Sequence, residues 1–218
     1  MYYSRKSIPK RLITAREAIE IVKEEPGIGK RMSVVGFTPV EMTSGLVYQQ
    51  DAERLYSTQD IEYGNQVAAT QTLRNIADAI RSRLIVDRRI AKTALKALPG
   101  LARQLRLAGP IAKLNEGLYN QASHFYTELQ SSEEAQERMA EYGTMTEMLS
   151  IRLSLVADMG EAMKAQQIRI GQAQLTTAKR QAAMRKLDIW MSRFIKAARL
   201  AFYDEPKELK KLGIYVKE

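Results

Sequence analysis

The stretch "VVGFTPVEM" at residues 34–42 joins a glycine-marked turn to the start of a helix. Thr38 can cap that helix, Pro39 suits its first position, and Glu41 stands where a capping-box acid belongs. No residue that stops a helix follows until the Pro-Gly pair at 99–100. The stretch therefore predicts one long helix over the residues that precede this pair.

A similar join, "AEYGTMTEM", occurs at residues 140–148. There Thr144 and Glu147 offer a second capping box, and the helix can run to about Tyr203 before Pro206 follows. Only shorter helices fit between the two runs, and they could not travel back along a helix of about 90 Å. We therefore expect the two long helices to be antiparallel.

Apolar residues recur along both runs with the spacing of a heptad seam. The polar residues Gln59, Gln66 and Thr70 occupy seam positions in the first run, so we expect looser packing there. Asp87 is the one charged residue on that seam. On the seams we expect Leu84, Leu187, Met191 and Phe194 to be buried and central to stability. Other apolar residues widen the stripe, which favours a bundle over a two-stranded coiled coil.

When the chain is aligned with itself at an offset of 107 residues, identical residues pair in the turns, in the middle of the long helices and after their ends. The pairs include the turn residues Gly36 and Gly143, the mid-helix residues Gly64 and Gly171, and the residues Pro99 and Pro206 that follow the helices. Further identical pairs are Gln59 with Gln166, Ile61 with Ile168 and Thr70 with Thr177. We therefore predict a tandem duplication, with one helical unit at 1–107 and a second at 108–218, packing as one domain. The expected fold is an all-α, elongated helical bundle with an internal two-fold repeat, built on two long antiparallel helices with shorter flanking helices.

The ending "ARLAFYDEPKELKKLGI" at residues 198–214 carries a resemblance. It resembles the close of a group of uncharacterised, tandemly duplicated all-helical bacterial proteins, whose repeats end in two acids and a proline followed by Leu-Gly-Ile. The first unit, which ends "KALPGLARQLRLAG", lacks the acidic pair. The resemblance implies a fold and no activity.

Composition limits the classes of protein that the chain can belong to. The 218 residues are 45% hydrophobic and 27% charged, which is typical of a folded protein. Without cysteine there is neither a disulfide nor a thiolate metal site. The N-terminal "MYYSRKSIPKRL" has no apolar core of a signal peptide, and no apolar run reaches the roughly 20 residues of a membrane span. We expect a cytoplasmic protein, or one inside a larger assembly.

Residues that could carry chemistry are few. His124 is the only histidine, and a di-iron bundle would need Glu three residues before it, where Gln121 stands. The stretch "EPGIGKRM" at 25–32 lacks the spacing and the Ser or Thr of a phosphate-binding loop. We therefore expect no enzyme, no catalytic residue, no cofactor and no metal.

Basic charge is the remaining functional signal. The net charge is +9, and cations concentrate in the second half of each long helical run. They can solvate the helices, or they can contact the phosphates of a polyanion without reading its sequence. For the second reading the candidate contacts are Arg81, Arg88, Arg89, Lys92, Arg180, Arg185, Lys186 and Arg193.

Two functions follow from these observations. The favoured one is a non-enzymatic structural or interaction protein that binds a protein partner, or itself, through helix packing as a subunit of an assembly. The alternative is a basic protein that associates with nucleic acid independently of sequence.

Overall fold

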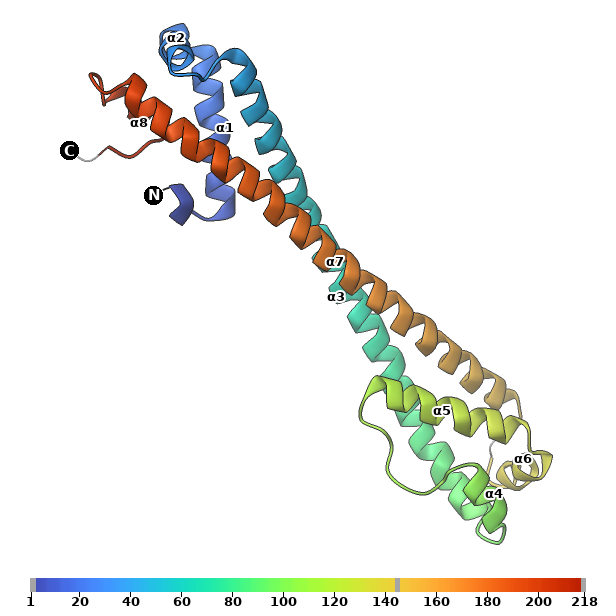
Figure 1. The fold of residues 1–218 in the computed structure, drawn as a ribbon. Helices are drawn as coiled ribbons and strands as arrows, with labels where there is room; N and C mark the ends of the chain where they lie inside the picture. The colour runs from blue at the N-terminus through green and yellow to red at the C-terminus, as the bar shows by residue number, and fades with distance from the viewer. Residues whose placement is uncertain (1–2, 144–145, 217–218) are drawn as a thin grey trace. The chain divides into compact units, whose positions relative to one another are not determined.

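The structure is a computed structural model that describes residues 3–143 and 146–216, and within those residues it contains helices and no strand. A 3-10 turn at Tyr3–Arg5 precedes eight α-helices in this part of the chain. They are α1 (Ile8–Glu24), α2 (Pro26–Val34), α3 (Pro39–Ala94), α4 (Pro99–Gln104), α5 (Asn115–Gln130), α6 (Glu133–Ala140), α7 (Thr146–Ala201) and α8 (Glu208–Lys211). The prediction of an all-α protein with two long helices is confirmed (Figure 1).

The chain divides into two compact units. Unit 1 comprises Met1–Tyr63 and Gln172–Glu218, and unit 2 comprises Gly64–Gly171. Unit 1 therefore contains α1, α2, the first part of α3, the last part of α7, and α8. Unit 2 contains the last part of α3, then α4, α5 and α6, and the first part of α7. Each unit combines residues from both predicted repeats, 1–107 and 108–218.

Within each unit the two long helices run antiparallel. In unit 1, Glu41 pairs with Arg193 at 3.1 Å, and further along α3 the Gln59 side chain donates to Thr177 Oγ1 at 3.2 Å. In unit 2, Gln166 donates to Thr70 Oγ1 at 3.2 Å, and Arg152 contacts Asp87. In both units a later residue of α3 meets an earlier residue of α7, as the antiparallel prediction requires.

Unit 1 has an aromatic core. The rings of Trp190 and Phe194 stack at a centroid distance of 5.3 Å, and Phe37 meets both of them edge-on. Trp190 lies directly against Gly45, where even one added carbon would overlap the indole ring. The core is closed by α1 and α2, which lie beside the first part of α3 (Figure 1).

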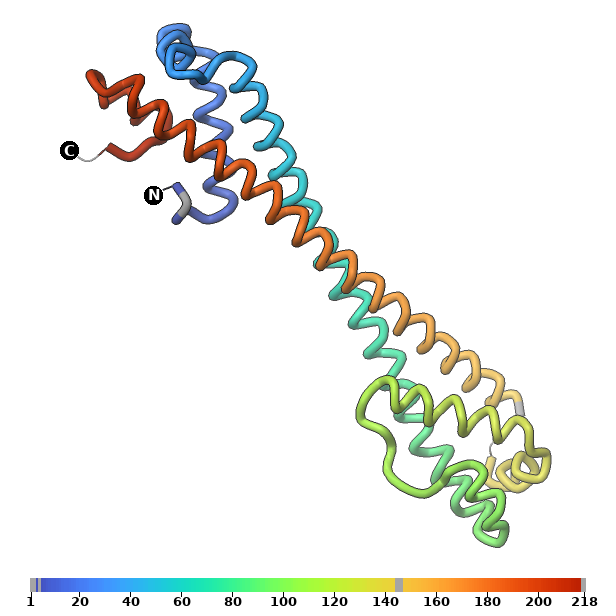
Figure 2. Tube along the Cα trace, viewed as in Figure 1, coloured from blue at the N-terminus to red at the C-terminus, as the bar shows by residue number. Residues whose placement is uncertain are grey.

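Unit 2 has a core of aliphatic residues with the rings of Phe125 and Tyr126, and it includes one buried ionic cluster. Leu84 and Ile80 of α3 pack with Phe125 and Tyr126 of α5. The connection from α4 to α5 is an extended loop (Figure 2). Its first residues, Leu105 and Leu107, are buried in the same core.

The predicted seam is confirmed by burial. Leu84, Leu187, Met191 and Phe194 are all buried. By contrast, no residue from 56 to 72 of α3 is buried, and none from 160 to 182 of α7. This confirms the expectation of looser packing around Gln59, Gln66 and Thr70. The physical reason is that polar seam residues exclude less water than leucine does.

The local helix signals predict the cap of α3 correctly but place the ends of both long helices a few residues too late. The Glu41 amide donates to Thr38 Oγ1 at 3.4 Å, so Thr38 caps α3 as predicted. The matching cap at Thr144 lies outside the described residues. Both long helices end slightly earlier than predicted, at Ala94 and Ala201, because the backbone turns before the prolines at 99 and 206.

The boundaries of the helices repeat at the spacing found in the sequence. The first residues of α1 and α5, of α2 and α6, and of α3 and α7 are each 107 positions apart, and so are the last residues of α3 and α7. The long helices each contain 56 residues. Gly36 and Gly143, which precede them, have the positive φ angles of 93° and 83° that glycine adopts readily. We call two residues that are 107 positions apart counterparts.

Candidate binding sites

The eight predicted polyanion contacts lie in different environments. Arg81, Arg88, Arg89 and Lys92 belong to unit 2, and Arg180, Arg185, Lys186 and Arg193 belong to unit 1. Four of them are exposed and have no ion pair within the described residues, namely Arg89, Lys92, Arg185 and Lys186. Arg193 is also exposed but pairs with Glu41, and Arg180 is half-buried. Arg81 donates to the carbonyl oxygens of Ala112 and Lys113, at 2.7 and 3.1 Å.

Arg88 has a structural position. Its side chain is buried, with the residue only 4% exposed, and its Nη2 donates to the carbonyl oxygens of Arg106 and Ala108 at 2.9 and 3.0 Å. Burial lowers the pKa of the Arg88 guanidinium, which nevertheless stays charged at neutral pH because its ordinary value is so high. Arg88 holds the loop after α4 in place and does not face solvent, so we do not include it in a polyanion surface.

Asp87, the charged residue on the seam, lies in a buried cluster in unit 2. Its Oδ2 accepts hydrogen bonds from the Tyr126 hydroxyl at 2.8 Å and from Arg152 Nε at 3.1 Å. Burial raises the pKa of the Tyr126 phenol above its ordinary value, and the charge of Asp87 raises it further. The cluster is satisfied by its own members and leaves no group directed at a ligand, so it is structural.

His124 and the glycines of residues 25–32, which were considered for chemistry, lie in helices α5 and α2. His124 Nε2 lies 2.9 Å from the carbonyl oxygen of Gln104, in a contact that joins α5 to the end of α4. Gly27 and Gly29 are inside helix α2 and not in a loop that could surround a phosphate. Among the described residues, no group of three or more metal-ligating side chains lies close together.

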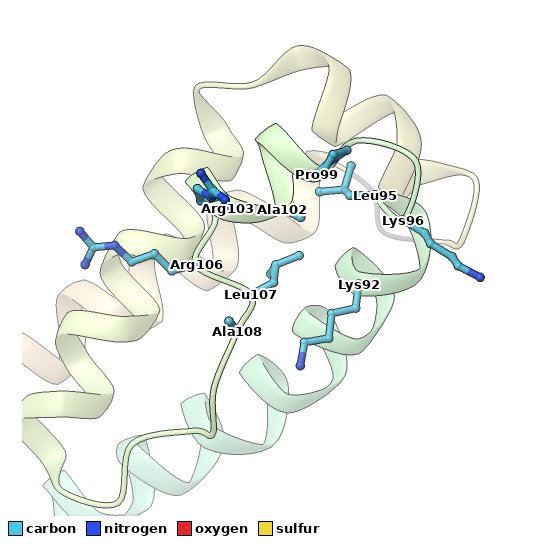
Figure 3. A pocket seen from close by; sticks show the side chains of 9 residues that line it. All are labelled: Lys92, Leu95, Lys96, Pro99, Ala102, Arg103, Arg106, Leu107 and Ala108. Atoms are coloured by element: carbon cyan, nitrogen blue, oxygen red, sulfur yellow. The ribbon is translucent and has the colours of Figure 1, made fainter.

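Unit 2 contains a cationic pocket of about 600 Å³ at the end of α3 and around α4. Its charged lining residues are all basic, namely Lys92, Lys96, Arg103 and Arg106. Its apolar lining includes Leu95, Ala102 and Leu107. Figure 3 shows Leu95 and Ala102 near the centre with Leu107 opposite them, while the charged ends of Lys96 and Arg106 extend outward in different directions. We call this cavity the cationic pocket.

Unit 1 contains an apolar hollow of about 700 Å³ between α1, α2 and the start of α3. Phe37 and Met42, both buried, line it together with Val34, which is 87% exposed. Val40, next to the lining residue Pro39, is 77% exposed. The charged residues of the lining are Lys23 and Lys30. We call this cavity the apolar hollow.

Among the eight predicted polyanion contacts, only Lys92 lines one of these cavities. Several of the other lining residues differ in size or charge from their counterparts, a difference that identities alone do not reveal. Ala102 has the larger counterpart Leu209, and Val34 has the charged counterpart Glu141.

Comparison with known proteins adds no candidate. No family model, curated protein or solved structure matches the chain. Within the described residues, no helix is both long enough and apolar enough to span a bilayer.

Proposed function

We propose that the protein is a non-enzymatic interaction protein, built by tandem duplication of one helical unit, that binds a partner protein through the apolar hollow of unit 1. The observation that carries this proposal is the exposure of Val34 in the lining of the hollow and of Val40 next to the lining residue Pro39, although both counterparts, Glu141 and Glu147, are charged. The fold therefore does not require an apolar residue at either place. Exposed apolar surface beside a cavity is characteristic of binding surfaces.

The duplication is supported by reciprocal contacts. Gln59 and Gln166 are counterparts, and so are Thr70 and Thr177. Gln59 bonds to Thr177 in unit 1 and Gln166 bonds to Thr70 in unit 2, both at 3.2 Å. Two identical antiparallel subunits, later joined into one chain, would make this same pair of bonds twice.

Burial of counterparts supports the same reading. Ala15 and Ala122 are both buried in their units, as are Met32 and Met139, and Leu105 and Leu212. Packing positions have thus been kept on both sides of the duplication. The surface residues around the apolar hollow have not been kept, which is expected if only unit 1 binds the partner.

The partner that fits the hollow is an amphipathic helix with acidic residues beside its apolar face. Phe37 and Met42 offer an apolar floor for two or three anchoring side chains, as grooves that bind helices do. Lys23 and Lys30 are the charged residues of the lining, and both are basic. In unit 2 the counterpart of Lys30 is Glu137, which would repel the same helix.

A photo-crosslinking residue placed at Val34 or at Val40 tests this function in cells. We expect a covalent adduct whose partner peptide is an apolar helix with acidic flanks. The same residue at Ile189, which is exposed elsewhere in unit 1, serves as the matched control and should give none. Val40→Glu beside a crosslinker at Val34, or Val34→Glu beside a crosslinker at Val40, copies the charged counterpart and should remove the adduct.

Three outcomes count against the proposal. Equal adducts at Ile189 and Val34 would show that the hollow is not a preferred surface. An adduct that survives the glutamate change at the other position would show that apolar contact does not hold the partner. An adduct only with a second copy, with a dimer by light scattering, would replace the partner protein by self-association.

Sequence-independent binding of nucleic acid is the second candidate. It is favoured by Arg89, Lys92, Arg185 and Lys186, which are exposed without an ion pair among the described residues. Trp190, four positions after Lys186 on the helix, is buried in the core of unit 1 and cannot stack on a base, so contacts of Arg185 and Lys186 would be to phosphates.

A further inference from the structure

The cationic pocket of unit 2 is a place where the two repeats differ in volume. Leu95 and Ala102 line it, and their counterparts in unit 1 are Phe202 and Leu209, both larger and both buried. Three other lining residues, Lys92, Leu107 and Ala108, have the counterparts Arg199, Ile214 and Tyr215. The cavity in unit 1 that these three counterparts line has a volume of only about 30 Å³. The fold can fill this space, and unit 2 leaves it open.

A second difference is the backbone at Arg106. Its φ angle is 49°, in the left-handed region, where a residue with a side chain is strained. The counterpart is Gly213, with a φ of 68°, which glycine adopts without such strain. Unit 2 therefore holds a cation on the rim of the pocket at a position where unit 1 has glycine. Strain of this kind persists at sites where the side chain has a use.

The lining determines which ligand would fit. The four charged lining residues, Lys92, Lys96, Arg103 and Arg106, are basic, so the pocket favours an anion. Their charged ends extend in different directions and do not converge on one point (Figure 3), so a compact ion such as phosphate is poorly coordinated. The centre is apolar, and a volume of about 600 Å³ lies in the usual range for small-molecule sites.

We propose that the cationic pocket binds a small amphipathic anion. The apolar part of the ligand lies against Leu95, Ala102 and Leu107, and its acidic group lies at the rim beside the basic side chains. Arg88, buried behind the loop, donates to the carbonyl oxygens of Arg106 and Ala108 and so holds two lining residues in place before the ligand arrives. The lining contains no aromatic side chain on which a nucleic-acid base could stack.

Calorimetric titration of the full chain with decanoate tests the proposal, with decanol and inorganic phosphate as comparison probes. We expect decanoate to bind, decanol to bind at least about tenfold more weakly, and phosphate alone to give no saturable binding. A tenfold difference corresponds to about 1.4 kcal/mol. Chemical-shift changes should centre on the amides of Leu95, Leu107 and Ala108.

Counterpart substitutions make the test specific to the pocket. Leu95→Phe with Ala102→Leu should fill the pocket and weaken decanoate binding at least tenfold, while the fold is kept because unit 1 tolerates the same residues. Ala102→Leu alone, the milder change, serves if the double variant does not fold. Arg106→Gly should weaken binding while the melting temperature is kept or raised, because it removes a cation together with the backbone strain.

Arg89→Gln is the matched control, since Arg89 is exposed on the same helix and does not line the pocket. It should leave decanoate affinity unchanged. Undetectable decanoate binding, or filled variants that bind as tightly as the wild type, would overturn the proposal. Equal binding of decanol would show that charge has no role. Competition by duplex DNA as strong as by decanoate itself would assign the pocket to nucleic acid. None of these results depends on Val34 or Val40, so the partner-binding proposal is tested separately.

Discussion

At the scale of single residues, the two glycines of α3 differ in the space around them. A Cβ at Gly45 would lie 2.2 Å from the Trp190 ring, closer than any real contact. A Cβ at Gly64 would meet nothing within 4 Å. Gly45 thus permits the close approach of the indole to the backbone, whereas Gly64 leaves open space inside a continuous helix.

We predict that Gly45→Ala lowers the free energy of unfolding by about 1–3 kcal/mol or more, the cost of overpacking a closed core. Gly64→Ala should instead raise it, by up to about 1 kcal/mol, because alanine favours a helix interior over glycine. Chemical denaturation of both variants measures the two effects. Equal destabilisation would mean that Gly64 also has a packing partner.

Divergence between counterparts is clearest at the position of Asp87. Its counterpart Phe194 is part of the aromatic core of unit 1, and the counterpart of Arg152 is Gly45, on which Trp190 packs. Unit 2 thus has an ion pair where unit 1 has an aromatic ring and a glycine. A buried pair of this kind does not by itself add stability, since desolvation offsets the attraction.

At the scale of elements, the long helices are held by a seam whose strength varies along their length. In each unit some seam positions are fully buried, as at Leu84 of unit 2 and Leu187 of unit 1. Around Gln59 and Thr70 they are only half-buried and joined by hydrogen bonds. Hydrogen bonds at seam positions define the register of a helix pair, while buried leucines supply most of the stability.

We predict that Leu187→Ala and Phe194→Ala each reduce the free energy of unfolding by about 2–5 kcal/mol, because both side chains lie in a closed core. Leu175→Ala is the matched control on the same helix, where the side chain is exposed and the change should stay within about 0.5 kcal/mol. Thermal melting of the three variants checks this. Unchanged melting temperatures for the first two would mean that the seam faces solvent.

At the scale of the whole molecule, the net charge of +9 is distributed over both units. Part of it is used internally, since Arg88 bonds to carbonyl oxygens and Arg193 pairs with Glu41. The cations that remain available to a polyanion are fewer than the composition suggests. Any binding of nucleic acid should therefore be weak, with a shallower dependence on salt than the net charge of +9 suggests.

We predict that changing Arg89, Arg185 and Lys186 to glutamine lowers affinity equally for random duplex and single-stranded DNA, if the protein binds nucleic acid. The slope of log K against log salt should shrink by about one unit for each lost phosphate contact. Fluorescence anisotropy at two salt concentrations measures it. Arg54→Gln, which removes one charge from a cation paired with Asp51 at 2.6 Å, should have a smaller effect than Arg89→Gln alone. No binding at about 50 mM salt would remove this function.

Much of the fold could be read from the sequence because its signals are local. The cap formed by Thr38, Pro39 and Glu41 acts over four residues, and the seam that includes Leu187 and Met191 repeats within each turn or two of helix. Thr14 and Glu17 have the spacing of a capping box, which favours a helix that starts near Thr14. Helix α1 begins instead at Ile8, and Thr14 donates back to the Lys10 carbonyl oxygen inside the helix. A threonine has the same local signature in both roles.

Only the tertiary structure distinguished Arg88 from Arg89. The two are neighbours in a basic stretch, but neighbouring positions on a helix point about 100° apart. What Arg88 meets is the backbone of a loop some 20 residues later in the chain. The cationic pocket has the same origin, since Leu95, Ala102 and Leu107 become one surface only when that loop folds over the end of α3. Local periodicity determines helices and their apolar faces, whereas a cavity depends on which loops return to cover them, and no spacing in the sequence encodes that return.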